Sequence, residues 1–117
     1  MHNFKELKVW QLAMSISKEV FIATRLFPSE EKFTLISQMM RSSISIPSNI
    51  AEGCGRKSNK EFYQYLNISL GSSFELETQL ILAREFNYIN EANFTPLQSQ
   101  IIEVQRMISG LQKSLNT

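Results

Sequence analysis

A cluster of basic side chains in the middle of the chain has the chemistry needed to bind phosphate. Residues 32–60 contain five bases and one acid, a local charge of +4, whereas residues 61–91 contain one base and five acids, a local charge of −4. Basic side chains gathered at one end of a helical protein can grip the phosphates of a nucleic acid, although a solvated helix end carries the same pattern. The side chains expected to contact phosphate are Arg41, Arg56, Lys57 and Lys60.

The sequence lacks the residues that catalysis usually needs. Its single histidine, His2, stands near the N-terminus, so no internal histidine serves a Glu-x-x-His metal site or a Cys–His nucleophile. Glu75 and Glu77 lie two positions apart in a helical segment and therefore point to different faces, which argues against a paired general acid and base. We expect no enzymatic activity, no cofactor and no bound metal.

Length and composition indicate one globular domain spanning residues 1–117. Of the 117 residues, 43% are hydrophobic and 20% are charged, and the net charge of +1 gives no overall attraction to nucleic acid or to an acidic membrane. No apolar run approaches the roughly 20 residues of a membrane-spanning helix. The single cysteine, Cys54, cannot form an internal disulfide and indicates a reducing compartment. We therefore expect a soluble cytoplasmic protein with no membrane partner.

Hydrophobic residues recur every three or four positions in four long segments, which is the spacing of amphipathic helices. The predicted helices span about residues 4–26, 30–54, 59–87 and 91–115. The connections between them are short, so each helix must pack beside its predecessor. The predicted fold is all-α, an antiparallel up-down-up-down four-helix bundle.

Polar residues mark the expected helix starts. Asn3, Ser29 and Ser58 are the predicted N-caps of the first three helices. The fourth helix has two predicted starts: near Glu91, with Pro96 in its first turns, or at Pro96 itself, with the preceding threonine as the cap. The sequence alone leaves both starts open.

Proline and glycine residues predict irregularities inside the helices. Pro47 has no amide hydrogen and its ring crowds the carbonyl of Ser43, so we expect the second helix to be kinked or interrupted there, with nearby serines bonding the freed backbone groups. Gly53 or Gly55 should end that helix in a left-handed conformation. Gly71, in the middle of the third helix, favours close packing against a neighbouring helix.

Motifs spread over most of the chain match one protein family, in the same order. They include Val9-Trp10-Gln11, Phe27-Pro28, Arg41-Ser42-x-x-Ser45-Ile46-Pro47-x-Asn49-Ile50-Ala51-Glu52-Gly53, Gly71-Ser72-x-x-Glu75-Leu76-Glu77 and Met107-x-x-Gly110-Leu111. With these motifs the chain resembles the 23S ribosomal RNA intervening-sequence protein family. That family also includes the accessory variability-determinant proteins of diversity-generating retroelements.

The resemblance implies an antiparallel bundle that assembles into a homopentamer and has no enzymatic activity. In the retroelement branch the accessory protein binds nucleic acid and partners a reverse transcriptase, so RNA or DNA and a reverse transcriptase are candidate partners. That branch is markedly basic, whereas this chain is nearly neutral, which favours the stand-alone branch. Within the shared motif, we expect Asn49 and Glu52 to brace the segment between Pro47 and Gly53 by hydrogen bonds rather than to touch a ligand.

Two functions are therefore favoured. The first is a non-catalytic, homo-oligomeric bundle protein that binds structured RNA or DNA through a basic face. The alternative is a protein–protein adaptor or assembly scaffold without nucleic-acid binding, which the near-neutral charge and the broad apolar surface of the third helix support. Both readings predict an oligomer, because the helices carry more apolar surface than one small bundle needs.

Overall fold

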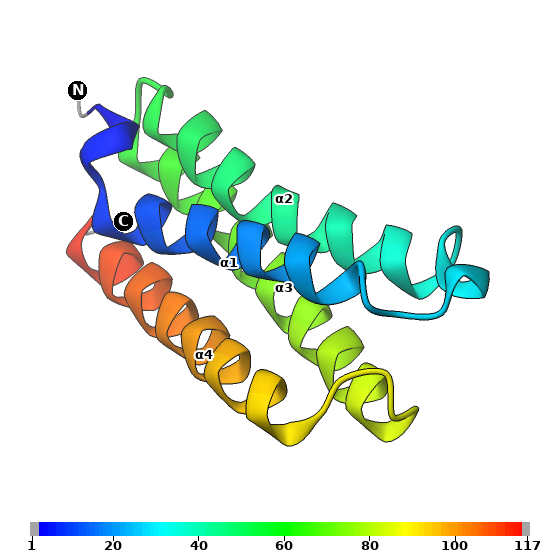
Figure 1. Cartoon of the computed structure of the whole chain (residues 1–117). Coiled ribbons are helices and arrows are strands. Elements are labelled where there is room, and N and C mark those ends of the chain that lie inside the picture. Colours follow the sequence, from blue (N-terminus) through cyan, green and yellow to red (C-terminus); the bar gives the residue numbers. More distant parts are fainter. Residues whose placement is uncertain (1–2, 116–117) are drawn as a thin grey trace.

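The computed structural model describes residues 3–115, and this part of the chain is all-α with no strand (Figure 1). Short 3-10 helices precede the first two α-helices. The elements in order are η1 (Phe4–Glu6), α1 (Lys8–Thr24), η2 (Ser29–Glu31), α2 (Leu35–Cys54), α3 (Asn59–Glu85) and α4 (Glu91–Ser114). The prediction of an all-α, four-helix fold is confirmed.

Consecutive helices run in opposite directions (Figure 1). Side-chain hydrogen bonds show the same arrangement, because Ser42 of α2 bonds Gln79 of α3, whereas Ser45, further along α2, bonds Ser72, which is earlier in α3. The fourth helix also packs against the first, so the four helices close a four-sided bundle. The bundle measures 43 × 24 × 20 Å.

The core is built from the predicted apolar stripes, with every helix contributing. Buried positions in each helix recur mainly every three or four residues, so one side of each helix faces the bundle axis. The largest fully buried side chains are Ile16, Val20, Met39, Ile46, Ile50, Leu66, Leu76, Leu80, Phe94, Ile101, Val104 and Ile108.

The first two helices begin later than the sequence predicts. Asn3 accepts a hydrogen bond from the amide of Lys5 at 3.1 Å, so it caps η1 rather than α1. Ser29 begins the separate turn η2, and α2 starts after Thr34. The hydroxyl of Thr34 donates to the carboxylate of Glu31 at 2.6 Å. The backbone of Thr34, with φ −120° and ψ −103°, is not helical, which separates this turn from α2.

The third helix begins at its predicted cap, and the fourth begins at one of its two predicted starts. Ser58 accepts a hydrogen bond from the amide of Glu61 at 3.1 Å, as a capping box requires. Asn90 accepts one from the amide of Asn93 at 2.9 Å, and α4 begins at the next residue. The fourth helix therefore takes the earlier of its two predicted starts, and Pro96 lies within its first turns.

Pro47 lies inside α2 without interrupting it, so the predicted interruption is wrong, while the predicted kink stays a prediction. The carbonyl of Ser43, which loses its usual amide partner to the proline, accepts the hydroxyl of Ser17 from α1 at 2.8 Å. One turn on, the hydroxyl of Ser69 from α3 donates to the carbonyl of Ile46 at 2.9 Å. Hydroxyls from both neighbouring helices thus support α2 around the proline.

The glycines act differently from the predictions. No glycine of the described residues has a positive φ, and Gly55 ends α2 with φ −81°, so the predicted left-handed cap is wrong. A Cβ added to Gly53 would lie 2.7 Å from the Cβ of Tyr65, so the absent side chain lets α2 and α3 approach closely. A Cβ added to Gly71 would meet nothing within 4 Å, which contradicts the predicted close packing within the bundle.

Candidate nucleic-acid interface

Three distant segments of the chain meet at one end of the bundle (Figure 1). η1 contacts α2 there, and the side-chain amide of Asn59 at the start of α3 donates to the carbonyl of Leu115 after α4 at 3.3 Å. We call this the basic end, since it carries six bases against the three acids Glu6, Glu52 and Glu61. Its bases are Lys5, Lys8, Arg56, Lys57, Lys60 and Lys113.

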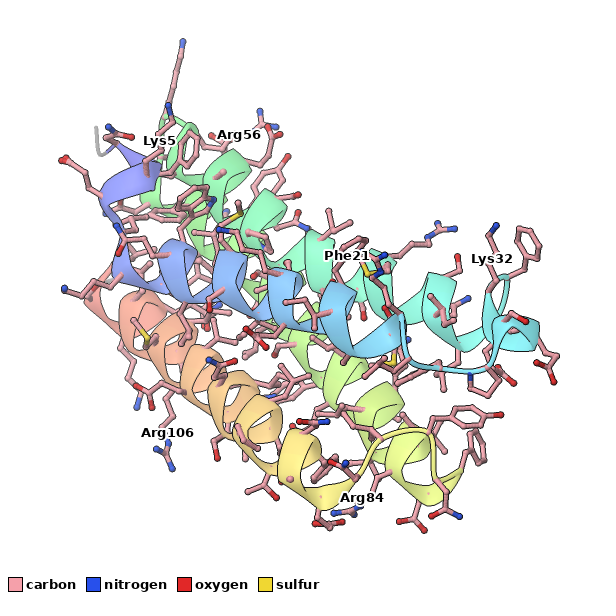
Figure 2. The ribbon with its side chains drawn as sticks, in the orientation of Figure 1. Lys5, Phe21, Lys32, Arg56, Arg84 and Arg106 are labelled. Atoms are coloured by element: carbon pink, nitrogen blue, oxygen red, sulfur yellow. The ribbon has the colours of Figure 1, made fainter. Side chains whose placement is uncertain are left out.

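Figure 2 shows two of these bases, Lys5 and Arg56, at the basic end, with Lys32 and Arg84 toward the other end. The opposite end carries three bases, Arg25, Lys32 and Arg84, against four acids: Glu30 and Glu31 in η2, Glu85 at the end of α3 and Glu91 at the start of α4. Positive charge is therefore concentrated at one end of a nearly neutral protein.

The structure brings together three of the four side chains expected to contact phosphate. Arg56, Lys57 and Lys60 lie in the α2–α3 connection or in the first turn of α3. Arg41 is exposed in the first half of α2, about 20 Å along the helix axis from the basic end. It belongs to the side of the bundle rather than to the cluster.

Arg56 is partly occupied by contacts within the protein. Its Nη2 atom donates to the carboxylate of Glu52 at 2.8 Å and to the hydroxyl of Tyr65 at 2.6 Å. The guanidinium also lies 4.9 Å from the centre of the Tyr65 ring. These contacts brace the end of α2 against α3, which makes Arg56 an organiser of the basic end.

Lys57 and Lys60 are both exposed, and neither pairs with an acidic side chain among residues 3–115. Their ammonium groups are therefore available to an external anion. Lys5, Lys8 and Lys113 are likewise exposed. Sequence reasoning missed these three because only the fold brings the two ends of the chain beside the α2–α3 connection.

The motif from Pro47 to Gly53 is engaged within the bundle. The side-chain amide of Asn49 donates to the carbonyl of Ser45 at 2.8 Å and to its hydroxyl oxygen at 2.9 Å. Glu52 pairs with Arg56, and Pro47 and Gly53 are buried. The motif residues thus shape α2 and its contact with α3.

Of the groups considered for catalysis, Cys54 is buried and Glu77 accepts a hydrogen bond from the side-chain amide of Gln105 at 2.9 Å. Burial raises the pKa of the Cys54 thiol above its ordinary value, which keeps it protonated at neutral pH. Within residues 3–115 no cluster of three or more His, Cys, Asp and Glu side chains could hold a metal ion. His2 lies outside the described residues.

Among the helices of the described part of the chain, none combines the length and the hydrophobicity needed to cross a lipid bilayer.

The comparisons with known proteins agree with the fold. A family model described as 23S rRNA-intervening sequence protein matches residues 5–110. A solved structure from Bacteroides thetaiotaomicron, a protein of unknown function from the S23 ribosomal protein family, superimposes with a TM-score of 0.83 at 24% sequence identity. The superposition covers 90% of this chain and 98% of that one. No curated protein matches. Since the family model spans nearly the whole bundle, the chain belongs to the 23S rRNA-intervening sequence protein family.

Proposed function

We propose that this protein is a non-catalytic, homo-oligomeric bundle, pentameric as the family resemblance implies, that binds structured RNA or DNA through its basic end. The observation that carries the proposal is the meeting of six bases from three distant segments at one end of the molecule. The non-catalytic part rests on the absence of any histidine beyond His2 and on the buried thiol of Cys54.

Charge placement explains how a protein of net charge +1 can bind a polyanion. Lys57 and Lys60 would contact phosphates directly, with Lys5, Lys8 and Lys113 around them. In an oligomer each copy presents the same cluster, so modest contacts add through multivalency. Arg41 would contact the same nucleic acid about 20 Å away, a distance that about six base pairs span.

The test compares charge reversals at opposite ends of the bundle. We expect the wild-type protein to bind labelled RNA or DNA hairpins in fluorescence anisotropy titrations, more weakly at about 200 mM salt than at about 50 mM salt. The double variant Lys57→Glu/Lys60→Glu should lose most of this binding and keep its helix content, because both side chains are exposed. Arg56 is left intact because it braces the fold.

The matched control is Lys32→Glu, which reverses an exposed charge at the other end of the bundle (Figure 2) and should leave binding unchanged. Equal binding by the double variant and the wild-type protein would exclude the basic end as the binding surface. No binding by the wild-type protein at the lower salt concentration would contradict the proposed function.

One observation favours the alternative, a protein–protein adaptor or scaffold. Several large hydrophobic side chains are at least half exposed, among them Phe21, Ile44 and Ile68. Apolar surface of this kind usually marks a protein interface. By family resemblance a reverse transcriptase is a candidate partner. Recovery of one defined protein after nuclease treatment, together with no nucleic-acid binding, would establish the adaptor function instead.

A further inference from the structure

The first of two unpartnered surfaces is a groove on the outside of α1 and α2. Two adjoining pockets, which share Met14 and Ser17, form it. We call it the α1/α2 groove; its apolar lining is Trp10, Met14, Phe21, Ile22, Met40, Ile44, Pro47 and Ala51. Phe21 and Ile44 are each 50% exposed, so residues 3–115 of one copy leave much of the groove open.

The second surface is the outward side of α3. Ile68 and Phe74 are each 52% exposed and Leu82 is 41% exposed. Gly71 lies among them, with open space where its Cβ would be. We call Ile68, Gly71, Phe74 and Leu82 the α3 ridge; at helical spacing they fall on one side of the helix.

The two surfaces carry opposite charges. Lys18 lines the groove, and the guanidinium of Arg25 lies 5.3 Å from the ring centre of Phe21. Glu75 is exposed within the α3 ridge, and α3 as a whole contains four acids and two bases. Opposite charges around two apolar surfaces favour their contact and set its orientation.

The surfaces are also of similar length, and Gly71 shapes the middle of the α3 ridge. Trp10 and Phe21 lie about 16 Å apart along α1, and Ile68 and Leu82 lie about 21 Å apart along α3. Gly71 costs α3 about 1 kcal/mol relative to alanine, and no neighbour within the bundle explains it. Between two copies, its missing side chain would let the backbone of α3 enter the groove.

We infer that the α3 ridge of one copy of this chain seats in the α1/α2 groove of a second copy. The inference rests on the oligomeric part of the proposed function and adds which surfaces join. Because the two surfaces differ, the contact is head-to-tail, so each copy keeps one groove and one ridge for further neighbours. Repetition closes a ring when the rotation between copies divides a full turn.

Two blocked variants test the pairing by light scattering after gel filtration. Ile44→Glu places a charge in the groove and Ile68→Glu places one on the ridge, both at half-exposed positions that the fold tolerates. Each variant alone should be monomeric. An equal mixture should form a dimer and nothing larger, since only the ridge of the Ile44→Glu copy and the groove of the Ile68→Glu copy remain intact.

A second test compares two glycines that both face open space. Gly71 in α3 is the tested position, and Gly110 in α4 is its matched control. Gly71→Leu should weaken assembly by more than about tenfold, the effect of about 1.4 kcal/mol, whereas Gly110→Leu should assemble like the wild-type protein. Circular dichroism checks that every variant keeps its helix content.

Several results would overturn the inference. One is an Ile68→Glu variant that keeps the wild-type mass, and another is a mixture of the two blocked variants that stays monomeric although both are folded. A monomeric wild-type protein would remove both the inference and the oligomeric part of the proposed function. Assembly as described without hairpin binding would leave the inference standing and overturn only nucleic-acid binding.

Discussion

Ser17 belongs to α1, yet its hydroxyl completes the backbone of α2. It donates to the carbonyl of Ser43, the group that Pro47 deprives of its amide partner. From the sequence we expected serines near the proline to supply such bonds. Ser42 and Ser43 do bond carbonyls within α2, at positions 39 and 40, but the carbonyl that the proline frees is satisfied from another helix. Which hydroxyl reaches a given carbonyl depends on helix packing, which local sequence does not reveal.

We expect Ser17→Ala to lower the free energy of unfolding by about 1–3 kcal/mol, because the partly buried carbonyl of Ser43 loses its donor. In a Pro47→Ala background the loss should be smaller, since alanine restores the backbone amide. Urea unfolding followed by circular dichroism measures both values. The control is Ser48→Ala, at an exposed position of α2 next to Pro47. An equal loss in both backgrounds would show that Ser17 does not compensate for the proline.

At the scale of the helices and their connections, one hydrogen bond joins two connections at the end of the bundle opposite the basic end. The hydroxyl of Tyr88, in the α3–α4 connection, donates to the carboxylate of Glu31 in η2 at 3.0 Å. Hydrogen bonds from Thr34 and then from Tyr88 lower the pKa of Glu31 below its ordinary value of 4.5. The bonds therefore stabilise the fold above that pH, and their contribution is lost as the pH falls through the lower pKa of the folded state.

Tyr88→Phe should lower the melting temperature near neutral pH and change it less as the pH falls below about 4. The variant keeps the ring that packs against Phe27 and Phe86, so the measurement isolates the hydroxyl. Thermal unfolding of both proteins across this pH range gives the difference. Tyr63→Phe, near the other end of α3, should show no such pH dependence. A constant difference for Tyr88→Phe would rule out the bond to Glu31 as its cause.

Helix packing also determines how replacing each glycine changes the stability of the protein. Gly53→Ala should destabilise the protein by about 1–3 kcal/mol, because the new Cβ would lie 2.7 Å from the Cβ of Tyr65 and 2.9 Å from Cδ1 of Phe62. Gly110→Ala, in open space on α4, should stabilise it by about 0.5–1 kcal/mol. Urea unfolding of the pair provides the test. A stabilising Gly53→Ala would contradict close packing of α2 on α3.

The helices themselves could largely be predicted, because periodicity and capping are local properties. Ser58 caps α3 as predicted, and α4 begins at Glu91, one of its two predicted starts, whereas Ser29 begins the separate turn η2 rather than α2. The role of Gly71 was predicted wrongly for a different reason. A small residue in a helix signals a close neighbour, but the sequence does not say whether that neighbour would lie in the same molecule.

On the scale of the whole molecule, the sequence predicted only three of the six bases of the basic end. Arg56, Lys57 and Lys60 are close in the chain and stay close in space, while the fold adds Lys5, Lys8 and Lys113 from the two ends of the chain. Arg41 was grouped with the cluster although a rigid helix carries it about 20 Å away. Counting charges along the sequence therefore identifies a cluster correctly when its residues lie in one turn. It fails when a length of helix separates them.

The hydroxyls between the helices have a consequence for axial register. Hydrophobic stripes repeat with every turn, so two helices could slide by one turn, about 5.4 Å, and still bury apolar surface. The bond from Ser17 to the Ser43 carbonyl freed by Pro47, and the bond from Ser42 to Gln79, depend on single residues and would be lost on sliding. These bonds therefore favour one offset between α1, α2 and α3. Every copy of the chain presents the same arrangement of lysines at its basic end.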